Sequence, residues 1–320
     1  MGSKDETTER RFTPIIGLFL GILAVSTASL FIRFAQVEVP SIVIAAGRLT
    51  IATLVLAPFA LKKGAGEFKQ ISRSDWLILA LAGSLLGFHF ATWITSLEYT
   101  SVASSVVLVT TAPLWVALFS PLLLKEKITT RVVIGLVISV CGSFIVGVSS
   151  SCEIIDHSLS CRGLGDLLNR NYLLGNILAL AGAFFSAGYL MAGRRVRNAV
   201  SLPVYTFSVY GIAALILCLM VAISGARISG YSSFSYLWII VLALIPQVIG
   251  HSAFNWALKY LPASYVSIAL LGEPIGTVLL AYLFLKEAPT TAEMFGGILI
   301  LTGIIVSTQL AQIRRNGRAA

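Results

Sequence analysis

The sequence predicts an all-α integral membrane protein with ten transmembrane helices in two inverted five-helix repeats. Three observations predict this fold. Hydrophobic residues make up 57% of the 320 residues and charged residues only 12%, whereas a soluble domain carries roughly 25% charged residues. The apolar residues form runs of about 20, the length at which a helix crosses a hydrocarbon core of about 30 Å. A shift of 161 residues superimposes the second half of the chain on the first.

The first repeat accounts for five predicted spans. Its first span contains the small-residue stretch 24–29 and could be mistaken for a signal peptide. Its apolar run is longer than the hydrophobic region of a signal peptide, and another span follows after a short loop, so we interpret it as a membrane span. We expect the five spans at residues 13–32, 41–61, 76–96, 102–123 and 131–149.

A hydrophilic stretch, residues 150–171, separates the two repeats and is too short for a soluble catalytic domain. It holds Cys152 and Cys161. We expect this loop outside the cell, where oxidising conditions favour pairing, so we predict a disulfide between them, with two unrelated thiols as the alternative. Two cysteines with His157 nearby are too few ligands for a metal, and we expect neither a metal site nor a cofactor.

The second repeat supplies five more spans, and the tails complete the domain plan. We expect the spans at residues 172–192, 203–224, 236–256, 263–285 and 292–312. The predicted domains are an N-terminal cytoplasmic tail, a first repeat, an extracytoplasmic loop, a second repeat and a C-terminal cytoplasmic tail, at residues 1–12, 13–149, 150–171, 172–312 and 313–320.

Basic residues predict the orientation of these spans. With a cytoplasmic N-terminus, 17 of the 23 Lys and Arg residues lie inside, five lie outside and Arg48 lies within a span. This bias follows the positive-inside rule and places both termini in the cytoplasm of a cell whose plasma membrane the protein crosses. The net charge of +9 is therefore a topology signal, and we expect no nucleic-acid partner.

The internal repeat rests on residues that apolar composition alone would not supply. Ala112-Pro113 falls on Glu273-Pro274, and the segment Leu124-Lys125-Glu126 falls on Leu285-Lys286-Glu287. Because each repeat has an odd number of spans, the second copy must be inserted upside down. Inverted repeats of this kind are typical of secondary transporters, with a substrate site near the midplane between the repeats.

These motifs resemble the drug/metabolite transporter superfamily and, within it, the EamA-type family of ten-helix transporters. The resemblance covers residues 13–312 and rests on Arg48 in the second span, on a Pro in the fourth, on Glu-Pro in the ninth and on the Lys-Glu that closes each repeat. It implies alternating access and export of amino acids or other small metabolites. The chain departs from the family pattern at Gly211, which stands near the position equivalent to Arg48, and in its longer loop between the halves.

Glu273 is the only acidic residue deep inside a predicted span. A carboxylate costs roughly 2.5 to 3.5 kcal/mol there, so it should face the bundle interior. Pro274 follows it and removes a backbone donor, so the ninth span can bend at this point, as the fourth can at Pro113. We expect these three residues to serve as a coupling group or hinge, with protons as the candidate coupling ion. The alternative is a structural carboxylate in a helix contact.

Arg48 is the only basic residue well inside a span. It needs an anionic partner or carbonyl oxygens. Three interpretations stay open: an ion pair with Glu273, recognition of a substrate carboxylate or phosphate by its planar fork, and a structural bond to helix-end carbonyls.

Two polar stripes in related spans predict a substrate cavity. His89, Trp93 and Ser96 share one face of the third span with Thr92 beside them, and the eighth span carries a related stripe. Taken together they suggest an aromatic-lined cavity for a small organic solute, although each alone could be a helix contact. The predicted cavity residues are His89, Thr92, Trp93, Ser96, His251, Phe254, Asn255, Arg48 and Tyr265.

The sequence therefore predicts a secondary transporter that exports an amino acid or another small polar or amphipathic metabolite. It has no phosphate-binding Gly-x-x-x-x-Gly-Lys motif for an ATP-driven pump, and the spans carry no catalytic residues of a known pattern, so we expect no enzyme activity. The alternatives are a nucleotide-sugar or phosphorylated-solute exchanger, and, in another class, an intramembrane enzyme or lipid-binding scaffold. We expect a small-molecule substrate and the lipid bilayer as partners, with a monomer and a homodimer both open.

Overall fold

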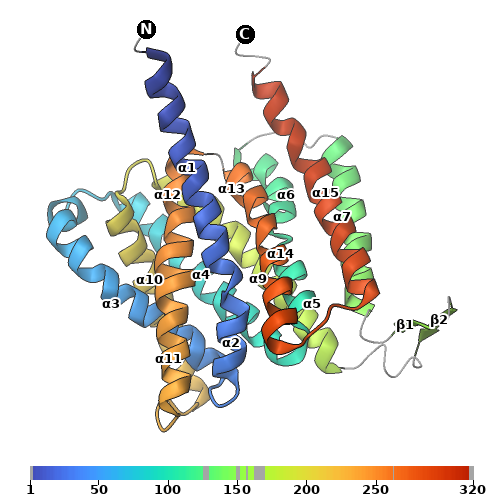
Figure 1. Ribbon diagram of the computed structural model, residues 1–320. Helices are drawn as coiled ribbons and strands as arrows, with labels where there is room; N and C mark the ends of the chain where they lie inside the picture. The colour runs from blue at the N-terminus through green and yellow to red at the C-terminus, as the bar shows by residue number, and fades with distance from the viewer. Residues whose placement is uncertain are drawn as a thin grey trace.

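The computed structural model describes residues 3–124, 130–148, 152–155, 158–161, 170–261 and 263–316. It is a helical bundle in which the start of α1 and the end of α15 lie at one end, and a small β-hairpin lies at the other (Figure 1). We call these the termini end and the hairpin end. The helices of the first repeat are α1 Ser3–Ser26, α2 Ala28–Gln36, α3 Ser41–Phe68, α4 Arg73–Tyr99, α5 Val102–Val109, α6 Ala112–Leu124 and α7 Thr130–Val148.

The second repeat follows the hairpin and contains more interrupted helices. Its eighth span passes through a π-helical turn, η1, and its ninth through a 3₁₀ turn, η2, and a π-helical turn, η3. The elements are β1 Cys152–Ile155, β2 Ser158–Cys161, α9 Arg170–Val196, α10 Leu202–Ser224, α11 Ser233–Leu242, η1 Ala243–His251, α12 Ser252–Tyr260, α13 Ala263–Ala269, η2 Leu270–Gly272, α14 Glu273–Leu280, η3 Ala281–Leu285 and α15 Thr291–Asn316.

The ten predicted spans correspond to this helix order, and the predicted fold class is confirmed. Seven helices in the described part of the chain are long and apolar enough to cross a membrane, and three shorter apolar segments lie at 133–146, 270–285 and 291–303. The chain is a multi-pass membrane protein. The loop between the repeats adds one feature that the sequence did not indicate, the antiparallel pair β1–β2.

In that hairpin the backbone of Cys152 pairs with the backbone of Cys161. The two cysteines therefore occupy opposite positions on neighbouring strands. Their side chains lie outside the part of the chain that the structure describes, so the disulfide stays a prediction.

Serine caps explain where several of the helices begin. Ser72, Ser101 and Ser232 each precede a helix, and their hydroxyl oxygens accept hydrogen bonds from the backbone N–H groups three residues ahead, at 3.1, 3.0 and 3.3 Å. These bonds satisfy donors that have no partner within the helix. The caps lie just outside the predicted apolar runs, so the helices of spans three, four and eight begin where the chain turns polar.

The helices that close the two repeats, α7 and α15, lie side by side (Figure 1). A Cβ on Gly142 would lie 2.6 Å from the carbonyl oxygen of Gly296, and a Cβ on Gly303 would lie 2.5 Å from that of Gly135. Position 142 corresponds to 303 under the 161-residue shift, and 135 corresponds to 296, so one contact is the symmetry copy of the other. The numbers run in opposite directions along the two helices, which is the geometry of an inverted repeat.

Acidic side chains also join the repeats at their loops. At the hairpin end, Glu38 Oε2 accepts hydrogen bonds from the backbone N–H of Ser232 at 2.8 Å and from Ser235 Oγ at 2.9 Å. These bonds lower the pKa of Glu38 below its ordinary value because they favour the charged carboxylate. At the termini end, Glu67 Oε1 accepts a bond from the Ser201 N–H at 2.5 Å. Each contact links a loop or helix end of one repeat to a loop or helix end of the other.

Candidate functional site

A cavity lies between the two repeats at the breaks in spans four and nine. Its space between atoms is about 570 Å³, counting its opening. The enclosed part that can admit the centre of a water molecule is about 50 Å³, so in this conformation the cavity is narrower than the sites of about 300–1,000 Å³ that hold small molecules. The lining residues come from both repeats: His89, Trp93, Val109, Thr110, Ala112, Pro113, Ser186, Tyr189, Leu190, His251, Phe254, Ser267, Leu270 and Glu273.

The two breaks that frame the cavity are copies of one another. In span four, α5 ends at Val109 and α6 begins at Ala112, and in span nine the turn η2 occupies the corresponding positions before α14. A Pro stands at the second residue of each following helix, Pro113 and Pro274, where its missing N–H costs no helical bond. Broken helices expose backbone groups, and in a membrane this is tolerated only where the backbone is buried in protein or lines a cavity.

Aromatic rings from the predicted stripes form one wall. The rings of His89 and Trp93 are stacked, with centroids 5.8 Å apart and an interplanar angle of 14°. The rings of His251 and Phe254 lie edge to face at 5.8 Å. The structure therefore brings these four predicted residues together around one cavity.

A hydrogen bond assigns the tautomer of His89. Its Nδ1 lies 2.9 Å from the carbonyl oxygen of Gly182. A carbonyl oxygen can only accept, so Nδ1 carries the hydrogen, and in the neutral ring Nε2 is left as an acceptor. His89 is thereby held with an acceptor nitrogen that has no hydrogen-bond partner among the described residues.

Glu273 begins α14 directly after the 3₁₀ turn. Ser26 Oγ donates to its backbone oxygen at 3.4 Å, and Thr277 Oγ1 donates to the backbone oxygen of Ser26 at 3.0 Å, so this part of span nine is tied to the first span. The Glu273 side chain makes no hydrogen bond or ion pair with another described residue. Glu273 is one of the residues that line the cavity, so it faces the interior of the bundle, as predicted.

Arg48 lies behind this wall and does not line the cavity. Its side chain is fully buried, its Nε donates to Gln247 Oε1 at 2.8 Å, and its guanidinium carbon lies 4.1 Å from the centroid of the Phe90 ring. Neither terminal nitrogen has a hydrogen-bond partner in the described part of the chain. Of the three open interpretations, the ion pair with Glu273 is not formed: the described residues hold one ion pair within 4.0 Å, between Arg33 and Glu287.

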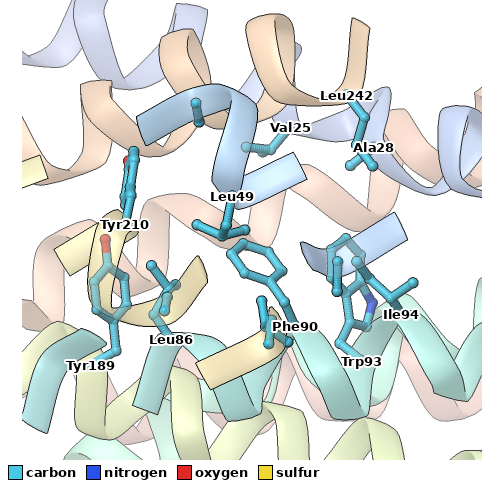
Figure 2. Close-up of a cluster of buried hydrophobic side chains, with 14 of the residues drawn as sticks. Val25, Ala28, Leu49, Leu86, Phe90, Trp93, Ile94, Tyr189, Tyr210 and Leu242 are labelled. Atoms are coloured by element: carbon cyan, nitrogen blue, oxygen red, sulfur yellow. The ribbon is translucent and has the colours of Figure 1, made fainter. Parts of the chain in front are cut away.

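Figure 2 shows the buried hydrophobic cluster that contains Phe90. The ring of Phe90 lies beneath Leu49 near the middle of the cluster, with Trp93 on one side and Tyr189 on the other. One face of the ring carries the guanidinium, and the ring of His251 meets it edge to face at 5.2 Å. Phe90 is thus a partition between the buried charge and the cavity.

Three predicted cavity residues lie outside the lining and have other partners. Ser96 Oγ shares a 2.6 Å hydrogen bond with Ser105 Oγ, and Thr92 Oγ1 donates to the carbonyl of Phe88 at 2.8 Å. Asn255 Oδ1 accepts from the Tyr189 hydroxyl at 2.5 Å, so it positions a lining residue. The side chain of Tyr265, the remaining prediction, lies outside the described part of the chain.

Sequence reasoning missed Tyr189, Ser186 and Gln247. Tyr189 and Ser186 are three residues apart on α9, so both reach the cavity from one helical face. That spacing could have indicated a polar face on the sixth span, but two residues are a weak pattern by themselves. Gln247 is the partner of Arg48 and lies in η1, where the wider turn changes which residues share a face.

An inverted-repeat helical membrane protein with a central cavity between broken helices has an architecture that is typical of transporters. Comparison with known proteins agrees. The chain belongs to the EamA-like transporter family, whose profile matches residues 12–148 and 173–309. The predicted resemblance is confirmed.

Relatives and a solved structure support the assignment. The chain is 27% identical over 254 residues to the uncharacterized transporter sll1164 of Synechocystis, covering 75% of this chain and 68% of that protein. It is 25% identical over 261 residues to the uncharacterized transporter YdfC of Bacillus subtilis, covering 80% and 78%. A crystal structure matches with a TM-score of 0.65 at 21% identity, over 94% of this chain and 98% of that one, and shares the fold.

Proposed function

We propose that the chain is a secondary active transporter that carries a small polar or amphipathic metabolite, such as an amino acid, out of a prokaryotic cell across the plasma membrane. The observation that carries the proposal is the cavity: both repeats line it, and it lies at the paired breaks of spans four and nine. A site between two inverted units can face either side of the membrane as one unit moves against the other. Both termini are cytoplasmic in this proposal.

The alternative of a phosphorylated-solute exchanger has less support. The described cavity lining contains no Lys or Arg, and the one deep guanidinium lies behind Phe90. An anionic phosphate would meet the Glu273 carboxylate in a described lining that holds no cationic side chain, with Arg48 acting only from behind Phe90. An intramembrane hydrolase of the two-carboxylate kind would need a second carboxylate, and the described lining offers one, Glu273.

Vesicle transport tests the proposal. Purified protein reconstituted into liposomes should accumulate labelled solute by counterflow from a panel of amino acids, amines and sugars. Trp93→Ala should change affinity or solute preference because it removes a ring of the cavity wall, whereas the matched variant Trp76→Ala should not, since Trp76 is 38% exposed on the bundle surface. Absence of flux for the whole panel, or turnover in detergent without a gradient, contradicts transport.

Glu273 is the proposed coupling group for a proton-linked step. It is a titratable side chain in the cavity and adjoins a helix break that can alter its exposure. A proton shifts an alternating-access equilibrium only by its different affinity for the two states. Net flux through the Glu273→Gln variant should therefore lose its dependence on a pH gradient. Full pH-driven flux through a folded variant would leave uniport, or coupling through His89 or His251, as the better account.

A further inference from the structure

The free polar groups of the cavity are mostly hydrogen-bond acceptors. The Glu273 carboxylate offers two oxygens and His89 offers Nε2, because its Nδ1–H is already bound to Gly182. On the donor side, Trp93 Nε1–H is unpartnered. Neutral His251 and the Ser186 hydroxyl can each both donate and accept, so they do not tip the balance toward donors. A solute that satisfies these groups must bring more donors than acceptors.

The charge of the described lining also favours a solute that is a cation and a hydrogen-bond donor. Glu273 is its only carboxylate, and the lining contains no Lys or Arg. Arg48 does not contact the cavity, since the Phe90 ring covers its guanidinium and its terminal nitrogens are buried, but its positive charge still acts on Glu273 from behind the ring. A solute carboxylate or phosphate would place a second negative charge beside Glu273, whereas a cation would neutralise it.

The rest of the lining is aromatic or apolar. The stacked His89 and Trp93 rings, with Tyr189 and Phe254, form flat apolar surfaces around the cavity and its opening. Trp and Tyr faces also attract a cation that lies within about 6 Å of the ring. These surfaces suit a planar apolar body attached to the cationic group.

We propose that the solute carried by this cavity is an organic amine: one cationic ammonium group, bound by the Glu273 carboxylate, on a planar apolar body that packs against Trp93. This inference rests on the proposed transport function and names its substrate class. The ammonium provides up to three donors for the free acceptors of the cavity, and its bond to a carboxylate is of the strong, charge-assisted kind. The charge of Glu273 then selects for the ammonium group, and packing against the aromatic rings of the cavity selects for the shape of the apolar body.

Three probes with one ring system and different charge test the inference. Binding of 2-phenylethylamine, phenylalanine and 3-phenylpropanoate to the purified full chain in detergent is measured by titration calorimetry. The amine should bind at least about tenfold more tightly than the propanoate, with the zwitterion between them. Tightest binding of the propanoate, or binding of none of the three probes, overturns the inference.

Variants at position 273 test the role of the carboxylate. Glu273→Gln should weaken amine binding about tenfold or more and reduce the preference for the amine over the propanoate, and Glu273→Asp should retain that preference. Glu98→Gln is the matched control, because Glu98 accepts a bond from the Ser41 N–H at 3.0 Å and does not line the cavity. Unchanged amine affinity in folded Glu273→Gln overturns the inference. If that variant does not fold, the order of the three probes on the unaltered chain decides.

Binding and flux separate this inference from the transport proposal. In one outcome, solutes other than amines are transported into vesicles, but 2-phenylethylamine is neither bound nor transported. That result would contradict the amine substrate class and would support the transport function. In the opposite outcome, no solute is transported, but 2-phenylethylamine still binds and its binding depends on Glu273. That result would contradict the transport function and would support the amine-binding site.

Discussion

Arg48 is a buried cation held by one amide and one aromatic face. Its Nε bonds Gln247 Oε1 at 2.8 Å, and its guanidinium lies over Phe90, whose ring also meets His251 of the cavity. If the hydrogen-bond partner of a buried charged group is removed, the charged group is left unsatisfied. The protein then loses more stability than the hydrogen bond itself contributes. Arg48 therefore supports the cavity wall from behind.

Arg48→Lys should lower thermal stability in detergent, by about 1–3 kcal/mol, and should weaken solute binding. A lysine keeps the charge but has no planar group to stack on Phe90 while bonding Gln247. The control is Arg195→Lys, at an exposed position of α9. Unfolding curves and calorimetric titrations on the purified variants measure both effects. A melting temperature and affinity equal to those of the control would show that the fork geometry of Arg48 does not matter.

Residue types explain which parts of the site could be predicted from sequence. His89, Trp93 and Glu273 are costly or conspicuous inside a membrane span, so their presence indicated an inward position. The partner of Arg48 could not be chosen from sequence, because the three open interpretations all rested on charge or on carbonyl oxygens, whereas the structure uses the neutral side chain of Gln247 and places a ring over the guanidinium. Distances between spans, on which such pairing depends, are absent from a hydropathy pattern.

At the scale of elements, the crossing of α7 and α15 depends on four glycines in two symmetry-related contacts. Gly142→Ala should destabilise the protein by about 1–3 kcal/mol, because a Cβ there would lie 2.6 Å from the Gly296 carbonyl oxygen and the helices would have to separate. Gly303→Ala should have a similar effect through Gly135. Thermal unfolding in detergent measures both.

Gly66→Ala is the matched control for the crossing, since nothing lies within 4 Å of a Cβ at that position in α3. Alanine also favours helix over glycine by about 1 kcal/mol, so the control should be neutral or slightly stabilised. If Gly142→Ala behaves like Gly66→Ala, the two helices do not require the close approach.

The paired breaks in spans four and nine predict a separate effect on turnover. Pro113→Ala and Pro274→Ala each restore a backbone donor beside a break, which should favour a straighter helix. We expect each variant to slow solute flux several-fold in vesicles without lowering the melting temperature, because the ground-state contacts remain. Pro58→Ala, at an exposed position inside α3, is the control. Unchanged flux in both break variants would argue against bending at these sites.

Helix positions were predictable from apolar runs, but their internal irregularities were not. Each predicted span corresponds to one helix or to a chain of short helices. The turn η1, Ala243–His251, contains Pro246 and widens the eighth span, whereas its counterpart in α4 is regular. One extra residue in a turn hardly changes the hydropathy of a span, although it changes which residues face Arg48.

Across the whole molecule, the two ends of the bundle are closed by different contacts. At the hairpin end, the start of α5 is bound by acids from the other repeat: Glu287 Oε1 accepts from the Val102 N–H at 2.5 Å, and Glu293 Oε1 accepts from Ser101 Oγ and, at 2.6 Å, from Ser104 Oγ. The positions equivalent to Ser101, Ser104 and Glu293 in the other repeat are Pro262, Tyr265 and Val132. These residues cannot reproduce the carboxylate-to-serine bonds, so the pseudo-symmetry is broken at the ends.

This asymmetry predicts which way the cavity opens when the contact is removed. Glu293→Ala deletes the acceptor shared by Ser101 and Ser104, so the state closed at the hairpin end loses stability relative to the state open there. Hydrogen bonds to a charged group are worth about 1.5–3 kcal/mol each, and about 1.4 kcal/mol changes a population ratio tenfold. A cysteine introduced by Ser186→Cys lines the cavity and reports its accessibility, after the four native cysteines are replaced by serine.

In intact cells, an impermeant maleimide should label Ser186→Cys about tenfold faster when Glu293→Ala is also present, because the hairpin end is predicted to face outward. Glu98→Ala is the control, since Glu98 bonds Ser41 within the same repeat and does not join the two repeats. An unchanged labelling rate in a folded double variant would show that the Glu293 bonds do not hold the cavity closed. Faster labelling from the cytoplasmic side alone, measured in inverted vesicles, would instead reverse the predicted orientation while keeping Glu293 as the contact that closes the hairpin end.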